Sequence, residues 1–486
     1  MRASYQAQVC PRMRFLSQDQ LEELHLAALE ILERTGALVL AQEAVDLLRA
    51  AGVRVSQDRV AKFPAHLVEA ALQSAPPRMT IADRNGEPSM FLERHRIYYG
   101  PGLDCPSIVD LTTGELRDTV LKDVENAAFL CDYLPNIDYL MSLGLASDVP
   151  ALLADRYHFK AMVSNSTKPI CFTAWDRDGL SDIIDMAAVV AGGLERLQER
   201  PFIILYCEII SPLKHSKDGL QKLLLCAEKN IPVIYTTGGM GGATMPATLA
   251  GSLAVANAEM LSALVIHQLK RRGAPFMYGG TLTIMDPVSM RFLHGAPEMY
   301  INQAALAELA SYYRLPMWGA AGCSDAKTFD QQAAIEAAYG ILMAALSGVN
   351  LVHDVGYLEN SMIASHEMLV ASDEIISMVK RIMRGIEITE DTLALDVIHE
   401  VGPGGHFLAE RHTVENFRKE FWFPQLMDRK GYEQWAEEGK TTLEQRVREK
   451  IRAILKEHSP EPLPSSIEEQ LEGILQRASE GIERRR

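Results

Sequence analysis

The chain of 486 residues is poor in cysteine, and its cysteines form no pattern. There are seven, without a CxxC pair, and an odd, scattered set does not resemble a disulfide framework. No His-x-Cys or paired-cysteine spacing indicates a zinc–thiolate site either, so we expect no protein-bound metal. The simplest environment for such a chain is a reducing one, and we predict a cytoplasmic protein.

Positive charge and uninterrupted apolar runs are also scarce. Lys and Arg total 48 against 64 Asp and Glu, a net charge of −16, which argues against nucleic acid and anionic lipid as partners. The stretch Met1–Phe15 has arginines but no apolar core, and Leu249–Ile266 is interrupted by Asn257 and Glu259. We therefore expect neither a signal peptide nor a membrane span. Small neutral or cationic ligands fit this charge better.

What the chain does contain is a repeated pattern of apolar run, polar or aromatic ending, and helical stretch. The runs recur at intervals of roughly 30 to 45 residues, which is typical of strand–helix units in parallel α/β proteins. The eight runs are Arg96–Gly100, Ile137–Leu143, Pro169–Trp175, Phe202–Ile210, Ile231–Gly238, Pro275–Thr283, Leu315–Gly322 and Asn350–Gly356. Eight units predict a closed α/β barrel, the (β/α)₈ TIM barrel, whose active site lies at the carboxyl ends of the strands.

The rest of the sequence predicts helical extensions on both sides of the barrel. The expected parts are a helical N-terminal extension over 1–90, the barrel over 91–385 and a helical C-terminal extension over 386–486. Ser17 and Gln20 have the spacing of a capping box, and Gly36 is expected to end the helix that they begin. The charged tail from Lys440 is expected to pack outside the barrel or on a partner chain, with a solvated helix as the alternative.

Ionisable residues interrupt two of the predicted strands, where a charge is costly unless it is used or paired. Glu208 interrupts the run Phe202–Ile210, and burial would disfavour an unpaired carboxylate there. Either an Arg or Lys partner compensates it, or it holds a cationic substrate. His353 and Asp354 are adjacent in their run and should point to opposite faces, so we assign His353 to the ligand side. A satisfied core histidine is the alternative.

Aromatic residues recur at or near the predicted strand ends. They are Tyr99, Trp175, Tyr206, Tyr235, Tyr278, Trp318 and Tyr357. An aromatic lining at the mouth of a barrel binds quaternary ammonium groups by cation–π attraction, whereas core packing is the alternative for each residue. Arg291 and Lys327 are candidates to pair with a substrate carboxylate. The stretch Gly238–Gly242 lacks phosphate-loop spacing and is expected to be a mobile or tightly turned loop.

Longer segments of the chain are distinctive as whole motifs. They are Trp318–Lys327, Asp330–Ala334, His353–Asn360 and Asp396–Leu408, the last containing the most specific stretch, Val-Gly-Pro-Gly-Gly-His-Phe-Leu. With Phe15–Gly36 and the tail Arg446–Pro464, they resemble the trimethylamine methyltransferase (MttB) superfamily over nearly the whole chain. The resemblance implies a TIM barrel whose mouth receives a methylamine and a partner protein carrying a corrinoid (cobalamin), with the methyl group passed to cobalt in the Co(I) state. It also suggests a homo-oligomer.

One departure from the family bears on the substrate. Trimethylamine-specific members carry pyrrolysine in a barrel loop, whereas this chain has ordinary residues there, in the neighbourhood of Cys323–Lys327. Members without pyrrolysine are similar to the glycine betaine:corrinoid methyltransferases. The resemblance therefore implies a quaternary amine substrate, with trimethylamine or another methylamine as the alternative. A betaine-binding protein without catalysis, and a lyase or isomerase on the same barrel, are further alternatives.

A quaternary amine suits the residues singled out above. Its methyl group leaves behind a neutral tertiary amine, so general acid catalysis is dispensable. The protein must desolvate the cation, orient one N–CH₃ bond and anchor the far end of the substrate. We predict that Tyr206 or Trp318 surrounds the ammonium group together with Glu208. Arg291, Lys327 or His353 would then hold a carboxylate.

Overall fold

A parallel sheet curled into a barrel forms the body of the molecule. The computed structural model describes residues 11–484, and within them seven strands pair side by side, each parallel to its neighbours. In spatial order they are β6 (Tyr98–Pro101), β15 (Leu351–Val355), β14 (Met317–Ala320), β13 (Phe276–Ile284), β12 (Val233–Gly241), β10 (Ile203–Ile209) and β9 (Ile170–Phe172). All seven overlap predicted runs, so the predicted α/β barrel is confirmed.

The remaining predicted run, Ile137–Leu143, closes the ring between β6 and β9. It does so through backbone hydrogen bonds rather than as a regular strand. The Asp138 amide donates to the Tyr99 carbonyl at 2.6 Å, and the Leu140 amide donates to the Pro169 carbonyl at 2.8 Å. The Cys171 amide returns a bond to Leu140 at 2.8 Å. These bonds give the backbone groups of both edge strands partners, as a closed barrel requires.

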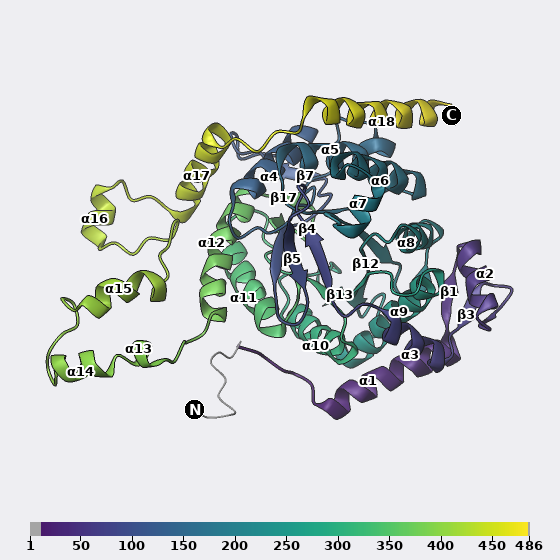
Figure 1. Cartoon of the computed structure of the whole chain (residues 1–486), viewed down its shortest axis with the longest axis horizontal. Helices are drawn as coiled ribbons and strands as arrows, with labels where there is room; N and C mark the ends of the chain where they lie inside the picture. Colours follow the sequence, from purple (N-terminus) through teal and green to yellow (C-terminus); the bar gives the residue numbers. More distant parts are fainter. Residues whose placement is uncertain (1–10, 485–486) are drawn as a thin grey trace.

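Helices between the strands surround the barrel (Figure 1). They are α4 (Leu121–Tyr133), α5 (Ala154–Asn165), α6 (Arg177–Ala191), α7 (Leu194–Glu199), α8 (Lys217–Lys229), α9 (Leu249–Lys270), α10 (Pro297–Tyr313), α11 (Gln331–Ser347) and α12 (His366–Met383). Strand residues that point outward join the large core under this helical layer. Both faces of the strands are therefore buried, which explains why their sequences are continuous apolar runs.

A second, smaller core fills the inside of the barrel. Its strand residues include Ile204, Tyr206, Ile234, Met277, Trp318 and Leu351. The hairpin of β4 (Met79–Ala82) and β5 (Pro88–Leu92) adds Met79, Ile81, Met90 and Leu92 to the same cluster. Figure 1 shows this hairpin lying across the barrel. It closes the N-terminal end of the barrel and leaves the carboxyl ends of the strands as the accessible mouth.

The N-terminal extension is partly helical and partly sheet, so the prediction of a helical extension was incomplete. Helix α1 (Gln18–Glu30) begins with the predicted capping box of Ser17 and Gln20 and continues as a π-helical turn (Ile31–Thr35). Gly36 ends this turn with a φ of 78°, as predicted. Around α2 (Gln42–Ala50) and α3 (Ala65–Ser74), three short strands, β1 (Ala37–Val39), β2 (Arg54–Val55) and β3 (Val60–Lys62), form a four-stranded sheet with β11 (Lys214–His215).

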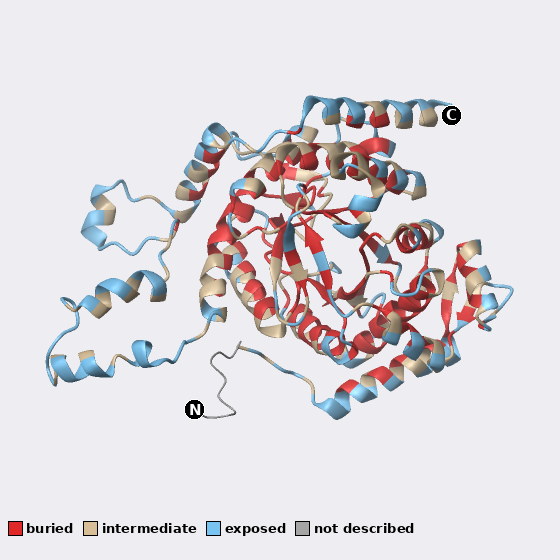
Figure 2. Cartoon of the chain, in the orientation of Figure 1, coloured by how far each residue is buried: buried red, intermediate tan, exposed pale blue. Residues whose placement is uncertain are grey.

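The C-terminal extension has two unlike parts. Helices α17 (Leu443–Glu457) and α18 (Ser465–Glu483) pack on the barrel through Val447, Ile451 and Leu471, so the tail lies against the outside of the body, as predicted. Residues 386–419, here called the arm, contain α13 (Glu390–Leu393), α14 (Leu395–Val401) and most of α15 (Arg411–Glu420). No arm residue is buried. Figure 2 shows the arm extending from the body without a buried segment, before α16 (Tyr432–Glu437) and α17.

Helix α9 is long and strongly apolar. By length and composition it could cross a membrane, yet 78% of its most apolar window is buried in the fold. The two polar residues that interrupt its apolar run have partners there: the Asn257 side chain donates to the Tyr313 hydroxyl at 2.8 Å, and Glu259 accepts from the Leu213 amide at 2.7 Å. The helix is thus a core helix of the barrel.

The glycine-rich stretch was predicted to be a mobile or tightly turned loop, but Gly238–Gly241 belong to the sheet, and a tight turn begins only at Gly242. Strand β12 continues to Gly241 and pairs with β13 to that residue. A Cβ on Gly239 would lie 2.7 Å from side-chain atoms of Leu282 and Met245. Glycine therefore serves close packing at this strand end rather than mobility.

Candidate active site at the mouth of the barrel

A cavity of about 1030 Å³ opens at the carboxyl ends of the barrel strands. We call it the mouth cavity. Among residues 11–484, its lining contains five carboxylates but one lysine and no arginine. The carboxylates belong to Asp104, Asp118, Asp155, Glu208 and Asp354, and the lysine is Lys222. This lining favours a cationic ligand, because unlike charges attract strongly in a partly desolvated site.

Aromatic rings form the base of the mouth cavity. The rings of Tyr206 and His353 stack with centroids 5.2 Å apart, and Trp318 meets the edge of His353 at 4.8 Å. Tyr357 lies 6.1 Å from His353 on another side. Four residues predicted separately at strand ends are thus in mutual contact. Tyr206, His353 and Tyr357 line the cavity, whereas Trp318 is fully buried beneath them.

Glu208 lies at the rim of the mouth cavity, above this aromatic base. It is exposed, although a carboxylate within an apolar strand was expected to be buried. The Tyr206 hydroxyl donates to it, and no Arg or Lys within the described residues lies in ion-pair distance. Burial, and then Glu208, raise the pKa of Tyr206 well above its usual value. Tyr206 therefore stays a neutral donor to the Glu208 carboxylate.

His353 and Asp354 both line the mouth cavity, although strand alternation predicted that one of them would face away. The reason is local backbone geometry: Asp354 has a φ of 83°, and the pairing of β15 with β6 shifts register between Val352 and Val355. A positive φ in a residue other than glycine is rare and concentrates at functional sites. Asp354 is buried and contacts two histidines, His353 and His294.

A second carboxylate, Asp104, is held by a network in the wall of the mouth cavity. It accepts hydrogen bonds from Ser142 at 2.9 Å and Thr173 at 2.9 Å, and His158 lies 3.4 Å away. Burial would raise the pKa of Asp104, but hydrogen bonds from His158, Thr173 and Ser142 outweigh it and lower the pKa. Asp104 is therefore ionised near neutral pH.

Three of the predicted substrate-binding tyrosines lie on the side of the strands that faces the helices, away from the barrel interior. Tyr99, Tyr235 and Tyr278 are fully buried in the core between strands and helices. The Tyr278 hydroxyl donates to Asn257 at 3.0 Å, which gives it a structural partner in α9. These residues do not line the mouth cavity, so their prediction as ligand contacts was wrong. Core packing, the alternative, holds for each.

The two predicted carboxylate anchors also lie outside the cavity. Arg291 pairs with Glu359 at 2.8 Å, and the exposed Lys327 donates to the Asp325 carbonyl at 2.8 Å. Within the mouth cavity, the cationic side chain is that of Lys222, which donates to the Ala174 carbonyl at 2.6 Å. Lys222, from α8, therefore replaces Arg291 and Lys327 as the candidate contact for an anionic group of the ligand.

One group of side chains in the wall has the composition of a metal site. His294, Cys323 and Asp354 are buried, and each offers a ligand atom within 4.8 Å of the others. Burial raises the pKa of the Cys323 thiol well above its usual value and lowers the pKa of His294. A metal ion would have to displace the thiol proton. Because the three residues are far apart in sequence, no spacing motif could reveal them.

Comparison with known proteins assigns the chain to a family. A family model described as trimethylamine methyltransferase (MTTB) matches residues 2–482. The chain belongs to the trimethylamine methyltransferase family. It is similar to the trimethylamine methyltransferase MttB of Desulfitobacterium hafniense, strain DSM 10664 / DCB-2, at 35% identity over 95% of this chain and 93% of the relative. It is also similar to the glycine betaine methyltransferase of Desulfitobacterium hafniense, strain Y51, at 34% identity over 97% of this chain and 99% of the relative.

A solved structure supports the fold of this methyltransferase family member. The monomethylamine methyltransferase (MtmB) of Methanosarcina barkeri aligns over 91% of this chain and 88% of its own, with a TM-score of 0.53 and 12% identity. The likeness shows the shared architecture alone. The chain is thus an enzyme of a methyltransferase family built on a TIM barrel, and the mouth of that barrel is where the fold places its chemistry.

Sequence reasoning missed several residues that line the mouth of this family member. Asp104, Asp155, His158, Lys222 and His294 lie in loops and helices rather than at the ends of apolar runs. No motif marks them, and folding alone brings them together. Asp354 could have been found, since it adjoins the predicted His353.

Proposed function

We propose that this protein transfers a methyl group from a quaternary ammonium compound, a betaine such as glycine betaine, to the Co(I) corrinoid of a partner protein. The observation that carries the proposal is the lining of the mouth cavity, with five carboxylates and an aromatic base against one lysine. Such a lining suits a fixed positive charge that cannot be neutralised by losing a proton. Its volume of about 1030 Å³ is at the upper end of small-molecule sites, which leaves room for a large cofactor to approach.

The proposed reaction makes few demands on the protein. The Co(I) nucleophile attacks one N-methyl carbon, the new Co–C bond forms, and the C–N electron pair leaves with nitrogen as a neutral tertiary amine. Cobalt is formally oxidised to Co(III), and no proton moves. Tyr206, His353 and Tyr357 would contact the ammonium methyl groups, while Glu208 and Asp354 would stabilise the charge. Catalysis would come from desolvation and alignment.

Exposed apolar residues around the mouth fit the docking of a corrinoid protein. They lie in loops after five of the strand positions: Leu145, Trp175, Ile210, Val288, Met290 and Met362. We call them the rim. Val288 is 90% exposed and Trp175 is 64% exposed, and clustered apolar exposure is typical of interaction surfaces. A Co(I) partner also requires the reducing, cytoplasmic environment that we predict.

The choice of substrate rests on Lys222. A betaine has a carboxylate, and Lys222 is the cationic anchor that the described part of the cavity offers for it. Trimethylamine, the alternative, has no such group and would leave Lys222 unused. Relatives named for each substrate are similar to this chain to nearly the same extent, so the chemistry of the cavity has to decide.

The arm suggests that the protein is a homo-oligomer. Within residues 386–419, large apolar side chains are exposed without a buried residue beside them: Ile386, Leu393, Leu395, Ile398, Phe407, Leu408 and Val414. The distinctive stretch ending in Phe407 and Leu408 is part of this surface. A second copy of the chain would bury it. Sedimentation should give an oligomer that Leu408→Glu weakens and that Ile335→Glu, an exposed change on α11, leaves intact.

A panel of methyl donors tests the proposed function. Purified protein, a reduced corrinoid protein and one donor at a time would be mixed anaerobically, and methyl-Co(III) followed by its absorbance. We expect transfer from glycine betaine or a related betaine, and little from trimethylamine. Transfer from trimethylamine alone would replace the betaine assignment. Binding of a betaine without transfer would favour a binding protein.

A further inference from the structure

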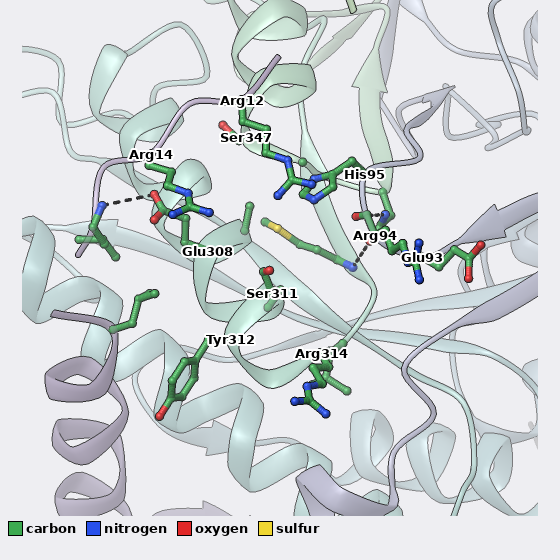
Figure 3. Close-up of a pocket in the computed structure, with 18 of the residues that line it drawn as sticks. Arg12, Arg14, Glu93, Arg94, His95, Glu308, Ser311, Tyr312, Arg314 and Ser347 are labelled. Atoms are coloured by element: carbon green, nitrogen blue, oxygen red, sulfur yellow. Dashed lines mark hydrogen bonds between the residues drawn. The ribbon is translucent and has the colours of Figure 1, made fainter. Parts of the chain in front are cut away.

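A second cavity, of about 1110 Å³, lies at the opposite end of the barrel. We call it the floor cavity. It is enclosed by the segment before α1, the loop that joins β5 to β6, and the C-terminal ends of α10 and α11. Figure 3 shows side chains from all of these segments directed around one opening. Because the barrel interior is plugged by the β4–β5 hairpin, the two cavities are separate sites.

Arginines dominate the floor cavity of a chain that is acidic as a whole. Five of them line it, Arg12, Arg14, Arg78, Arg94 and Arg314, against two glutamates. Within residues 11–484, none of the five forms an ion pair with a carboxylate. Both glutamates have other partners: Glu93 lies 3.9 Å from Arg96, and Glu308 accepts from the Phe15 amide at 2.6 Å. The lining therefore has an excess of positive charge.

Backbone hydrogen bonds fix the chain at most of these arginines. The Met13 amide, between Arg12 and Arg14, donates to the Leu346 carbonyl at 2.9 Å. The carbonyl of Arg94 accepts from the Asn350 side chain at 3.1 Å. Arg314 caps α10 with a φ of 57° and donates its amide back to the last turn. A backbone ordered around one opening lowers the cost of bringing the arginine side chains to an anion.

The wall of the floor cavity carries a further sign of a polar ligand. His95 has a buried Nδ1 with no hydrogen-bond partner among the described residues. Burial, and then Arg12 and Arg14, lower the pKa of His95, so its ring is neutral. The Nδ1 atom lies close to Gly348, which has a φ of 89°. A Cβ added at Gly348 would lie 2.8 Å from this nitrogen. A neutral imidazole can donate to an anion from one nitrogen.

Helix ends explain only part of this arrangement. The C-terminus of a helix favours a nearby cation, and Arg314 at the end of α10 fits that role. Arg12, Arg14, Arg78 and Arg94 belong to no helix. Their convergence on one cavity with an unused imidazole nitrogen needs another cause.

We infer that the floor cavity binds a small molecule carrying at least two phosphate groups. Guanidinium groups bind phosphate oxygens in pairs, and several arginines on different segments suit a multiply charged phosphate better than a single carboxylate. The volume admits a molecule larger than inorganic phosphate. This site is independent of methyl transfer at the mouth.

Calorimetric titration of the full-length protein with inorganic pyrophosphate at constant ionic strength tests the inference. Saturable binding at one site per chain is expected. The double variant Arg94→Gln with Arg314→Gln should weaken it at least about tenfold, since two charge-assisted contacts are lost. Both side chains are exposed, so folding should survive, which circular dichroism would check.

Matched controls decide between this site and unspecific charge. Arg54→Gln, on the exposed strand β2, should leave the affinity unchanged, and so should Glu208→Gln at the mouth. No saturable binding, or equal binding by the double variant, would overturn the inference. Citrate of similar charge binding as tightly as pyrophosphate would overturn the assignment to phosphate.

Discussion

The two ends of the barrel differ in charge far more than in size. The mouth cavity measures about 1030 Å³ and has five carboxylates and one lysine, whereas the floor cavity measures about 1110 Å³ and has five arginines and two glutamates. The strands between them contribute aromatic and aliphatic side chains to one shared interior. The loops at each end, rather than the strands, therefore determine which ligand charge an opening accepts. Experiments that alter one end should therefore leave the other unchanged.

The largest expected effect is at Asp354. Asp354→Asn should lower turnover about 100-fold, equivalent to ~2.7 kcal/mol of transition-state stabilisation, because it removes a buried carboxylate that we propose to face the substrate. Asparagine tolerates a positive φ, so the backbone should keep its shape. Single-turnover methyl transfer measures the effect, and pyrophosphate titration of the floor should be unaltered. A normal rate would remove Asp354 from the reaction.

The rim should affect the protein partner rather than the small substrate. The double change Val288→Glu with Met290→Glu places charges on the exposed apolar loop after β13. We expect kcat/KM for the corrinoid protein to fall about 30-fold, since docking surfaces lose affinity when their apolar contacts are replaced. Betaine binding, measured by calorimetry, should not change. An unchanged kcat/KM would move the docking surface elsewhere.

A smaller loss is expected at Glu208. Glu208→Gln keeps the shape of the side chain but removes its charge beside Tyr206, and turnover should fall about tenfold, or ~1.4 kcal/mol. Glu199→Gln, an exposed change at the end of α7, is the matched control and should have no effect. If both variants turn over equally, the Glu208 carboxylate does not contact the substrate.

Lys222 should discriminate between substrates. Lys222→Gln should raise KM for glycine betaine about fivefold, because a carboxylate loses a charged partner, roughly 1 kcal/mol. Choline, which has the same ammonium head without a carboxylate, should bind equally well to both forms. A parallel loss for choline would show that Lys222 acts on the structure of the cavity rather than on the carboxylate.

No effect is expected from chelation. The proposed leaving group is a neutral amine that needs no Lewis acid, and we predicted no protein-bound metal. Dialysis against EDTA should leave methyl transfer unchanged, with the metal content measured by mass spectrometry before and after. A loss that zinc restores would instead make His294, Cys323 and Asp354 a metal site.

The sequence predicted the barrel well because buried parallel strands are continuous apolar runs with polar endings. The same property hid which side chains point inward, since both faces of each strand are apolar. Within β10 the inward residue is Tyr206, but in β12 it is Ile234, so the neighbouring Tyr235 faces the helices. One sequence alone therefore could not show which alternate residues of each strand point into the barrel.

Other features of the site depended on structure that no pattern records. Because the strand register shifts at Asp354, the side chains of the adjacent residues His353 and Asp354 both line the mouth cavity. The unpaired arginines of the floor come from segments scattered between residues 12 and 314. Resemblance to a family predicted the chemistry. That Arg291 and Lys327 lie outside the mouth cavity could be seen only once the loops were folded.

The most direct test of the account is the fate of a labelled methyl group. Glycine betaine with ¹³C in its N-methyl groups would be mixed with this protein and one equivalent of Co(I) corrinoid protein, and followed by ¹³C NMR. The account predicts one labelled methyl on cobalt and one equivalent of dimethylglycine per turnover. Label that stays on betaine, while betaine occupies the mouth cavity, would contradict it.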